Sequence, residues 1–169
     1  MLGRMQLERE IAIDAPVSTV WEVLSDARLL PEWVPAVDEV VACSADGEAV
    51  GTVRHCTVQL ARRAGRIVER CVEFNPMTRA AYDLDDESFG MRRMFADYGF
   101  ALNPIAEAGS RTRVRVDTYY TPRSAFYGLI NVMVVRRRFR SVVDGLLVGL
   151  KTLSEARHDA QRTSNAHNR

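Results

Sequence analysis

The first 35 residues hold three local patterns whose order constrains the fold more than any other part of the chain. Residues 7–14 alternate between apolar and polar side chains, which predicts a strand. Pro16 follows where a proline fits the first turn of a helix, because its missing N–H costs nothing there. The apolar residues after it recur on one helical face: Val17, Val20, Trp21 and Leu24. A second short helical segment spans residues 29–34 and ends at Pro35.

Six consecutive segments typical of strands follow Pro35. They span residues 37–43, 51–60, 66–74, 79–84, 91–102 and 112–121. Turn signals separate them, among them Asn75-Pro76 and Asn103-Pro104. The gaps are too short for parallel crossovers, which need about a dozen residues, so the strands pair as antiparallel hairpins. With the first strand they predict a seven-stranded antiparallel sheet.

The region from Ser124 to about His158 lacks proline and predicts a helix. Its apolar stripe changes face near residues 135–138, so we expect a short apolar helix, a bend and a long amphipathic helix packed on the sheet. The polar residues 159–169 predict a disordered tail. The length of the chain predicts a single domain over residues 1–158.

The predicted elements leave room for a cavity. A sheet of this size twists and curves around whatever covers its inner face. One helix is about 10 Å wide and cannot fill that concavity alone, and the two short helices close only one end of it. The remaining volume is expected to be an apolar pocket that buries a small ligand.

Composition argues against several classes of function. A formal net charge of +1 gives no global field that would recruit nucleic acid. The three cysteines lack the spacing of a zinc site, and without an export signal they predict reduced thiols and a cytoplasmic protein. No phosphate-binding loop, metal-ligand cluster or nucleophile elbow is present in the sequence. We therefore expect no metal and no cofactor.

The order of elements and several short motifs resemble the START (SRPBCC) superfamily, most closely its bacterial polyketide cyclase/dehydrase branch. The opening motif is Asp-Ala-Pro-x-x-x-Val-Trp-x-x-Leu-Ser-Asp at residues 14–26, followed by Pro-x-Trp at residues 31–33. Further similar motifs are Val-Gly-Thr-Val-Arg at residues 50–54, Val-Glu-Arg at 68–70 and Tyr-Thr-Pro at 120–122. The likeness covers residues 7–155.

This resemblance implies the α+β helix-grip fold, in which a curved seven-stranded antiparallel sheet wraps a long C-terminal helix and two short helices follow the first strand. It also implies a hydrophobic ligand. It does not imply catalysis, because the family mixes enzymes with binding proteins that share no catalytic residues.

Strand parity and the expected helix positions select the candidate cavity walls. These are Trp33, Tyr82, Tyr98, Phe100, Tyr120, Phe126, Ile130 and Met133. An indole at Trp33, between two prolines, would stack on a flat ligand or else seal that end of the core.

Three polar residues are candidates for ligand contact or catalysis: Arg54, His55 and Glu69. The parity of residues 66–74 is ambiguous. Glu69 either pairs with Arg54 inside the pocket or forms a solvent-facing ion pair worth under about 1 kcal/mol, and the second arrangement is slightly favoured. His55 would act as a general base in a cyclisation or dehydration, although an ordinary strand histidine is the simpler interpretation.

The run Arg-Arg-Arg-Phe-Arg at residues 136–140 follows an apolar segment. It would hold an anionic group or contact a membrane transiently, or it forms a solvated face at the helix bend. The predicted function is binding of a small hydrophobic molecule, aromatic, polyketide-like or lipid. Alternatives are a cyclase, aromatase or dehydrase that uses an acid–base pair in the cavity, a quinone or lipid carrier at a membrane surface, and a ligand-dependent regulatory module. The sequence does not determine the oligomeric state, so a dimer is an open alternative, and no nucleic-acid partner is expected.

Overall fold

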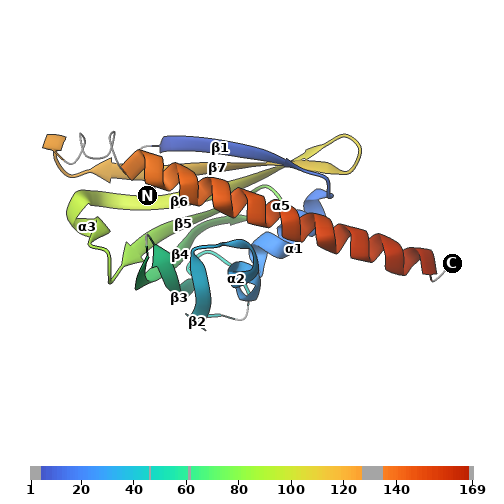
Figure 1. The fold of residues 1–169 in the computed structure, drawn as a ribbon, viewed down its shortest axis with the longest axis horizontal. Coiled ribbons are helices and arrows are strands. Elements are labelled where there is room, and N and C mark those ends of the chain that lie inside the picture. Colours follow the sequence, from blue (N-terminus) through green and yellow to red (C-terminus); the bar gives the residue numbers. More distant parts are fainter. Residues whose placement is uncertain (1–4, 46, 61, 127–134, 168–169) are drawn as a thin grey trace.

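The computed structural model describes residues 5–45, 47–60, 62–126 and 135–167. Strand β1 (Met5–Ile13) leads into α1 (Val17–Ser25), a 3₁₀ turn (Ala27–Leu29) and α2 (Leu30–Trp33). The following elements are β2 (Val37–Cys43), β3 (Val53–Leu60), β4 (Arg63–Asn75), β5 (Arg79–Asp86), α3 (Met91–Met94), β6 (Phe95–Glu107), β7 (Arg111–Pro122) and α5 (Arg136–His167). Figure 1 shows their arrangement.

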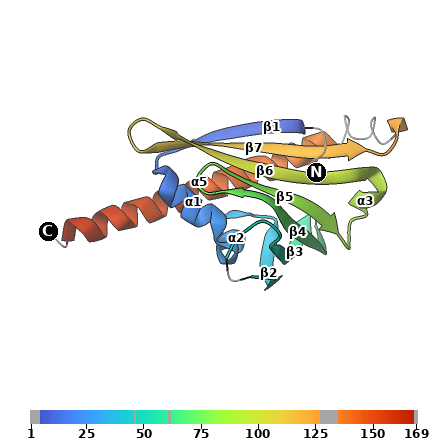
Figure 2. The same cartoon turned by 180° about the vertical axis from the view of Figure 1, so that it is seen from behind.

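The strands form one antiparallel sheet in the order β1-β7-β6-β5-β4-β3-β2. The sheet curves, and α5 runs diagonally across one face, while Figure 2 shows the opposite face with α5 behind the strands. The short helices α1 and α2 lie against α5 near the β2 edge. The predicted seven-stranded antiparallel sheet, the long C-terminal helix and the two short helices after the first strand are confirmed.

The first part of the chain folds as its pattern predicts. Leu7 and Ile13 are 4% and 0% exposed, so the apolar side of β1 faces the core. Pro16 lies immediately before α1, and the buried face of that helix includes Val20 and Trp21. Helix α5 then comes into backbone contact with α2: a Cβ built on Gly149 would lie 2.1 Å from the Trp33 carbonyl oxygen. Only glycine permits this approach.

The turn predicted at Asn103-Pro104 is wrong, because both residues lie inside β6. The pairing of β5 with β6 ends at Ala80↔Leu102, and beyond it β6 pairs only with β7. A proline is tolerated where a strand has lost one neighbour, because no partner there needs its N–H. The hairpin lies further on, at Gly109 and Ser110, which both have positive φ. The chain also forms the single helical turn α3 where the predicted strand was to begin.

The C-terminal helix is longer than expected. Residues 159–167, predicted to belong to a disordered tail, continue α5 through His167, and this end of the helix projects beyond the sheet. Ala160, Gln161 and Arg162 favour helix, and adding residues to an anchored helix is easier than starting one. The expected short apolar helix before the bend falls largely on residues 127–134, which lie outside the described residues.

Two apolar clusters form the interior. The larger one joins β1, α1, α2, the sheet and α5. A smaller one consists of Phe95, Tyr98 and Tyr120, with Val135 and Phe139 packed against it where α5 begins. Within the described ranges, no helix has the length and apolar character needed to cross a membrane.

Candidate ligand-binding site

A buried ion pair lies on the inner side of the sheet. Arg54 on β3 is the register partner of Glu69 on β4, and Arg54 Nε donates a hydrogen bond to Glu69 Oε2 at 2.5 Å. The two residues are only 2% and 4% exposed. The slightly favoured prediction, a solvent-facing ion pair between these two residues, is therefore wrong. The pair lies in the interior, where an uncompensated charge would be costly.

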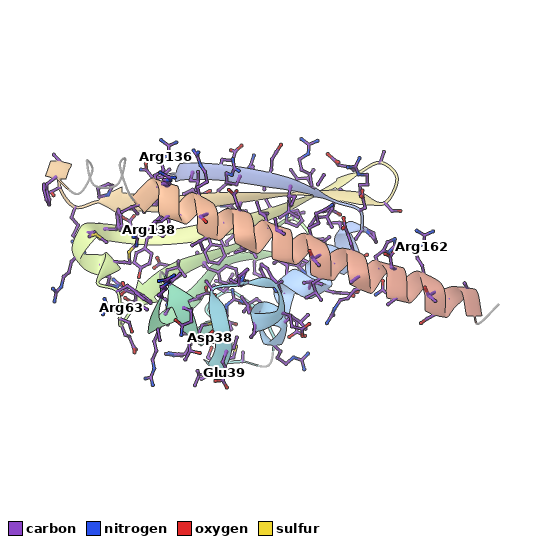
Figure 3. The ribbon with its side chains drawn as sticks, in the orientation of Figure 1. Asp38, Glu39, Arg63, Arg136, Arg138 and Arg162 are labelled. Atoms are coloured by element: carbon purple, nitrogen blue, oxygen red, sulfur yellow. The ribbon has the colours of Figure 1, made fainter. Side chains whose placement is uncertain are left out.

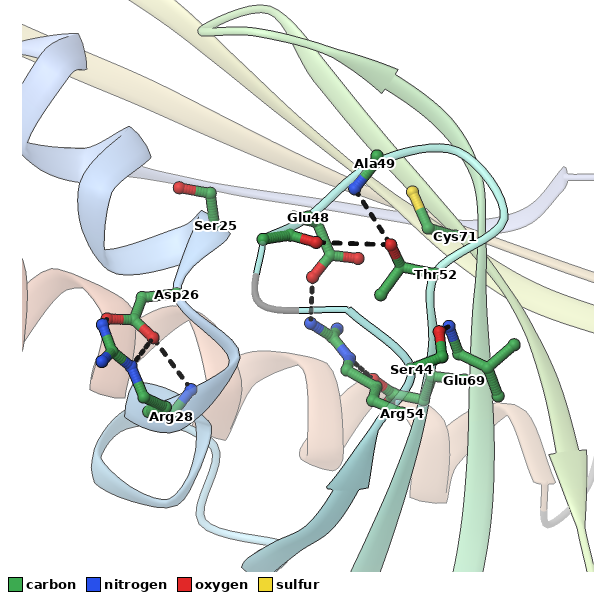
Figure 4. Close-up of polar contacts among 12 residues, drawn as sticks. Ser25, Asp26, Arg28, Ser44, Glu48, Ala49, Thr52, Arg54, Glu69 and Cys71 are labelled. Carbon is green, nitrogen blue, oxygen red and sulfur yellow. Dashed lines mark hydrogen bonds and ion pairs between the residues drawn. The ribbon is translucent and has the colours of Figure 1, made fainter.

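The loop between β2 and β3 adds a second carboxylate. Glu48 Oε2 lies 3.4 Å from Arg54 Nη1, and the Glu48 side chain is 2% exposed (Figure 4). The loop is fixed by hydrogen bonds from Gly51 N to Cys71 O and from Cys71 N to Thr52 O, at 2.8 and 2.9 Å. Sequence reasoning missed Glu48. Its only signal is an acidic residue in a glycine-bounded loop, six positions before an inward-facing arginine.

The three charged groups do not titrate independently. Burial raises the pKa of Glu48, and the nearby Glu69 charge adds to this effect while Arg54 opposes it. Burial alone would lower the pKa of Arg54, but the Glu69 charge and that of Glu48 reverse this and raise it. A raised pKa favours the protonated form of Glu48. Glu48 is therefore easier to protonate than an exposed glutamate, and when protonated it can donate a hydrogen bond or a proton beside Arg54.

Tyr82 on β5 completes this arrangement, which we call the Arg54 cluster: Glu48, Arg54, Glu69 and Tyr82. The Arg54 guanidinium carbon lies 4.2 Å from the centroid of the Tyr82 ring. Tyr82 is fully buried, and burial raises the pKa of its hydroxyl. The Tyr82 hydroxyl lies close enough to Glu48 to lower the pKa of that carboxyl, but among the described residues neither this hydroxyl nor Glu48 Oε1 makes a hydrogen bond of ordinary geometry. Two buried oxygens thus retain hydrogen-bonding capacity, which is what a site for a polar ligand atom requires.

The other aromatic candidates divide between the two apolar clusters. Trp33 is 2% exposed and packs in the larger one. Phe100 stacks against Tyr82, with ring centroids 5.2 Å apart. Tyr98 and Tyr120 belong to the smaller cluster, and the Tyr98 hydroxyl donates to Asp86 Oδ2 at 3.0 Å. These five residues are therefore interior, but they do not meet at one point.

Two predicted site residues face away from the interior. His55 is exposed, because it follows the inward-facing Arg54 and successive strand residues alternate sides. It therefore does not serve as a base at the Arg54 cluster. Phe126 is 68% exposed and lies beyond the end of β7, so it is not a wall of the interior. Ile130 and Met133 lie outside the described residues.

Two clefts bounded by described residues lie elsewhere on the molecule. One, of about 770 Å³, runs between the β6–β7 hairpin and the C-terminal half of α5 and includes Arg111 and His158. The other, of about 470 Å³, lies between the start of β4 and the α3 loop and includes Arg63 and Phe89. Neither contains a member of the Arg54 cluster, so the expected internal cavity stays a prediction. Across the same residues, no three His, Cys, Asp or Glu side chains are grouped as in a metal site.

The sequence matches the protein family described as "Polyketide cyclase / dehydrase and lipid transport" over residues 4–155. No curated protein matches it significantly.

Solved structures show the same fold at low sequence identity. The Zhui aromatase/cyclase from Streptomyces sp. R1128 is 19% identical, with a TM-score of 0.69 over 91% of this chain and 96% of its own. A START superfamily protein from Mycobacterium smegmatis is 14% identical, with a TM-score of 0.68 over 94% and 99% of the two chains. Norcoclaurine synthase from Thalictrum flavum, a point mutant in complex with a transition-state analogue, is 14% identical, with a TM-score of 0.70 over 91% and 96%.

Proposed function

This chain belongs to the polyketide cyclase/dehydrase and lipid-transport family, and from that premise we propose that it binds a small apolar molecule bearing a neutral oxygen group. The molecule would lie between the concave face of the sheet and α5, with its oxygen at the Arg54 cluster. One observation carries the proposal. Two buried oxygens that lie close to each other, the Tyr82 hydroxyl and Glu48 Oε1, make no hydrogen bond of ordinary geometry among the described residues, in an interior that is otherwise mostly apolar.

The charges of the cluster favour a neutral ligand group. Arg54 is already paired with Glu69 at 2.5 Å and contacts Glu48 at 3.4 Å. A ligand carboxylate would be a third acidic group around one guanidinium in a buried setting, where like charges repel strongly. A ketone, quinone or phenol oxygen would instead accept from Tyr82 or protonated Glu48 without adding charge. The ligand class that fits is therefore a neutral, oxygenated apolar molecule rather than a fatty acid.

Titration calorimetry tests this choice with two probes, 1,8-dihydroxyanthraquinone and palmitic acid. The quinone is expected to bind and the acid to bind much more weakly at pH 8. Tyr82→Phe should weaken quinone binding about threefold to tenfold, the usual effect of one hydrogen bond. Tyr119→Phe is the matched control, because its hydroxyl contacts Arg79 and Asp117 rather than the Arg54 cluster. Failure of both probes to bind, or tighter binding of palmitic acid, would overturn the proposal.

A second candidate function, acid–base catalysis on a bound polyketone, is favoured by the raised pKa of Glu48. The solved structures that resemble this chain include an enzyme named as an aromatase/cyclase. In an intramolecular aldol addition, the enol carbon would form a bond to a ketone carbon and the ketone oxygen would take the Glu48 proton. The enol hydroxyl would release its own proton, which restores the Glu48 acid, so the step consumes nothing else.

The rate of aldol cyclisation of a 1,3,5-triketone, followed by absorbance, tests this second function. Glu48→Gln should reduce the rate at least tenfold while leaving quinone affinity within about threefold. Glu39→Gln, an exposed glutamate on β2, is the control and should change neither quantity. Equal rates for the wild type and Glu48→Gln would leave binding alone as the function.

A further inference from the structure

Arginines gather at one end of the molecule. This arginine-rich end is defined by ten residues, all exposed: Arg62, Arg63, Arg66, Arg92, Arg93, Arg123, Arg136, Arg137, Arg138 and Arg140. Figure 3 labels Arg63, Arg136 and Arg138 at this end, with Arg162 towards the opposite end. The chain as a whole has a formal net charge of only +1, so its positive charge is strongly localised.

The fold brings these arginines together from distant parts of the sequence. The first residues of β4 are joined to the loop before α3 by the hydrogen bond from Glu87 N to Arg66 O. Helix α3 is joined to the end of β7 by Arg123, whose backbone N–H donates to Met94 O at 2.9 Å. The first turns of α5 pack on the same end through Phe139, which contacts Tyr120.

Most of these charges are not neutralised within the protein. Arg92 forms an ion pair with Asp85, and Arg123 Nε donates to two carbonyl oxygens. The other eight form no ion pair with a carboxylate among the residues that the structure describes. Asp86, just before α3, already accepts hydrogen bonds from three backbone N–H groups and from Tyr98. The exposed Glu87 lines the same cleft as Arg63, Arg92 and Arg93 and offsets only one of the positive charges. Positive charge therefore dominates the surface here.

An exposed aromatic residue lies at the tip of the same end. Phe126 is 68% exposed, four positions after the last residue of β7. The smaller apolar cluster of Phe95, Tyr98 and Tyr120 lies directly behind this surface. An exposed aromatic side chain at the same end of a molecule as clustered arginines is typical of proteins that insert a ring at a bilayer interface while cations contact lipid phosphates.

We propose that the arginine-rich end docks on the surface of an anionic phospholipid bilayer, with Phe126 inserted among the headgroups. The charge is complementary to that surface, which attracts clustered basic residues over roughly one Debye length. A DNA duplex would contact the arginines with its phosphates, but its bases are already stacked and offer the exposed ring no apolar phase to enter, so the combination favours a membrane. Docking goes beyond the proposed ligand site, and it would bring the bilayer close to the apolar interior from which a ligand is exchanged.

Co-sedimentation with vesicles tests the proposal, with two kinds of vesicle: pure phosphatidylcholine, and phosphatidylcholine with 30% phosphatidylglycerol. We expect binding only to the second kind and its loss between about 0.05 and 0.5 M NaCl, as surface electrostatics require. Arg136→Gln/Arg137→Gln should reduce partitioning about tenfold or more, from the usual contribution of each basic residue near an anionic surface. Phe126→Ser should weaken binding most visibly at intermediate salt.

The control is Arg157→Gln/Arg162→Gln, which removes the same charge from the opposite end of α5 and should leave partitioning unchanged. Equal losses in the two double variants would mean that net charge alone acts, and would overturn the proposal. So would tight binding to DNA fragments with no binding to anionic vesicles. Quinone affinity is measured on the same variants and should not change, because these arginines are not part of the Arg54 cluster. A loss of vesicle binding with unchanged quinone affinity therefore concerns the docking surface and not the ligand site.

Discussion

Arg54 and Glu69 face each other on adjacent strands, and their side chains are joined at 2.5 Å although both are almost fully buried. Together with Glu48, the pair provides the ionisable groups that an apolar ligand would meet if it entered beside Tyr82. Its burial also makes it a sensitive point for stability, because neither charge can be solvated if its partner is removed.

Arg54→Met is therefore expected to lower the free energy of unfolding by about 3–5 kcal/mol, because Glu69 is left buried without a partner. The double variant Arg54→Met/Glu69→Leu should lose less than the single one. Urea unfolding at pH 7 measures both. Arg113→Met, which breaks an exposed ion pair with Glu107, should cost under about 1 kcal/mol. An equal cost for Arg54→Met and Arg113→Met would contradict the burial of the pair.

Gly149→Ala is expected to destabilise the protein by more than about 2 kcal/mol, at the upper end of ordinary substitutions. The new methyl group would meet the Trp33 carbonyl oxygen at 2.1 Å, and a backbone atom cannot move aside cheaply. Gly145→Ala provides the comparison on the same helix, since its nearest contact is Pro35 at 3.7 Å. That variant should be neutral or stabilised by up to about 1 kcal/mol through helix propensity. Thermal unfolding of both variants decides, and the reverse order of stability would be inconsistent with this packing of α5 on α2.

The raised pKa of Glu48 predicts a specific dependence of stability on pH. The folded state holds this proton more tightly than the unfolded state, where the pKa is near the usual 4.5. Its contribution to stability is therefore present below about 4.5 and is lost as the pH rises through the folded-state pKa. Glu48→Gln cannot lose a proton. Its stability relative to the wild type should increase as the pH rises above 4.5. A constant difference for Glu48→Gln in urea unfolding between pH 4.5 and 8 would refute the raised pKa.

The cysteines are expected to differ in reactivity. Burial raises the pKa of Cys56 to about 12 and that of Cys71 to about 11, and both side chains are 1% exposed. Cys43 is exposed on β2. At pH 8, a disulfide reagent should therefore modify one thiol quickly in the native protein and all three after unfolding in urea. Two or three fast thiols in the native state would disagree with the packing of β3 and β4.

Much of the fold follows from periodicity. Strands with one wet face alternate at a period of two, and Pro16 marks the start of α1, so the sheet and the two short helices were predictable. The turn at Asn103-Pro104 was predicted wrongly, because a local turn signal contains no information on where β5 stops pairing with β6. The extent of α5 past His158 was missed for a similar reason, since composition alone does not show that a helix is anchored further back.

The candidate site was less accessible from sequence. The inner face of β4 changes at a register shift between Cys71 and Glu73, so apolar residues occur on both sides of the strand and parity alone could not orient Glu69. Glu48 is brought to Arg54 by a loop whose conformation depends on hydrogen bonds to Cys71, some 20 residues away. Such contacts between distant residues leave no local pattern to read.

The central claim is that an apolar ligand with a neutral oxygen group binds beside Arg54 and Tyr82. The side-chain Nε–H of Arg54 is buried and hydrogen-bonded to Glu69, so it should give a distinct ¹H–¹⁵N NMR signal. Titration with 1,8-dihydroxyanthraquinone should shift this signal, and the dissociation constant obtained from the shift should equal the one from calorimetry. Shifts confined to the two surface clefts, with the Arg54 signal unmoved at saturation, would contradict the claim.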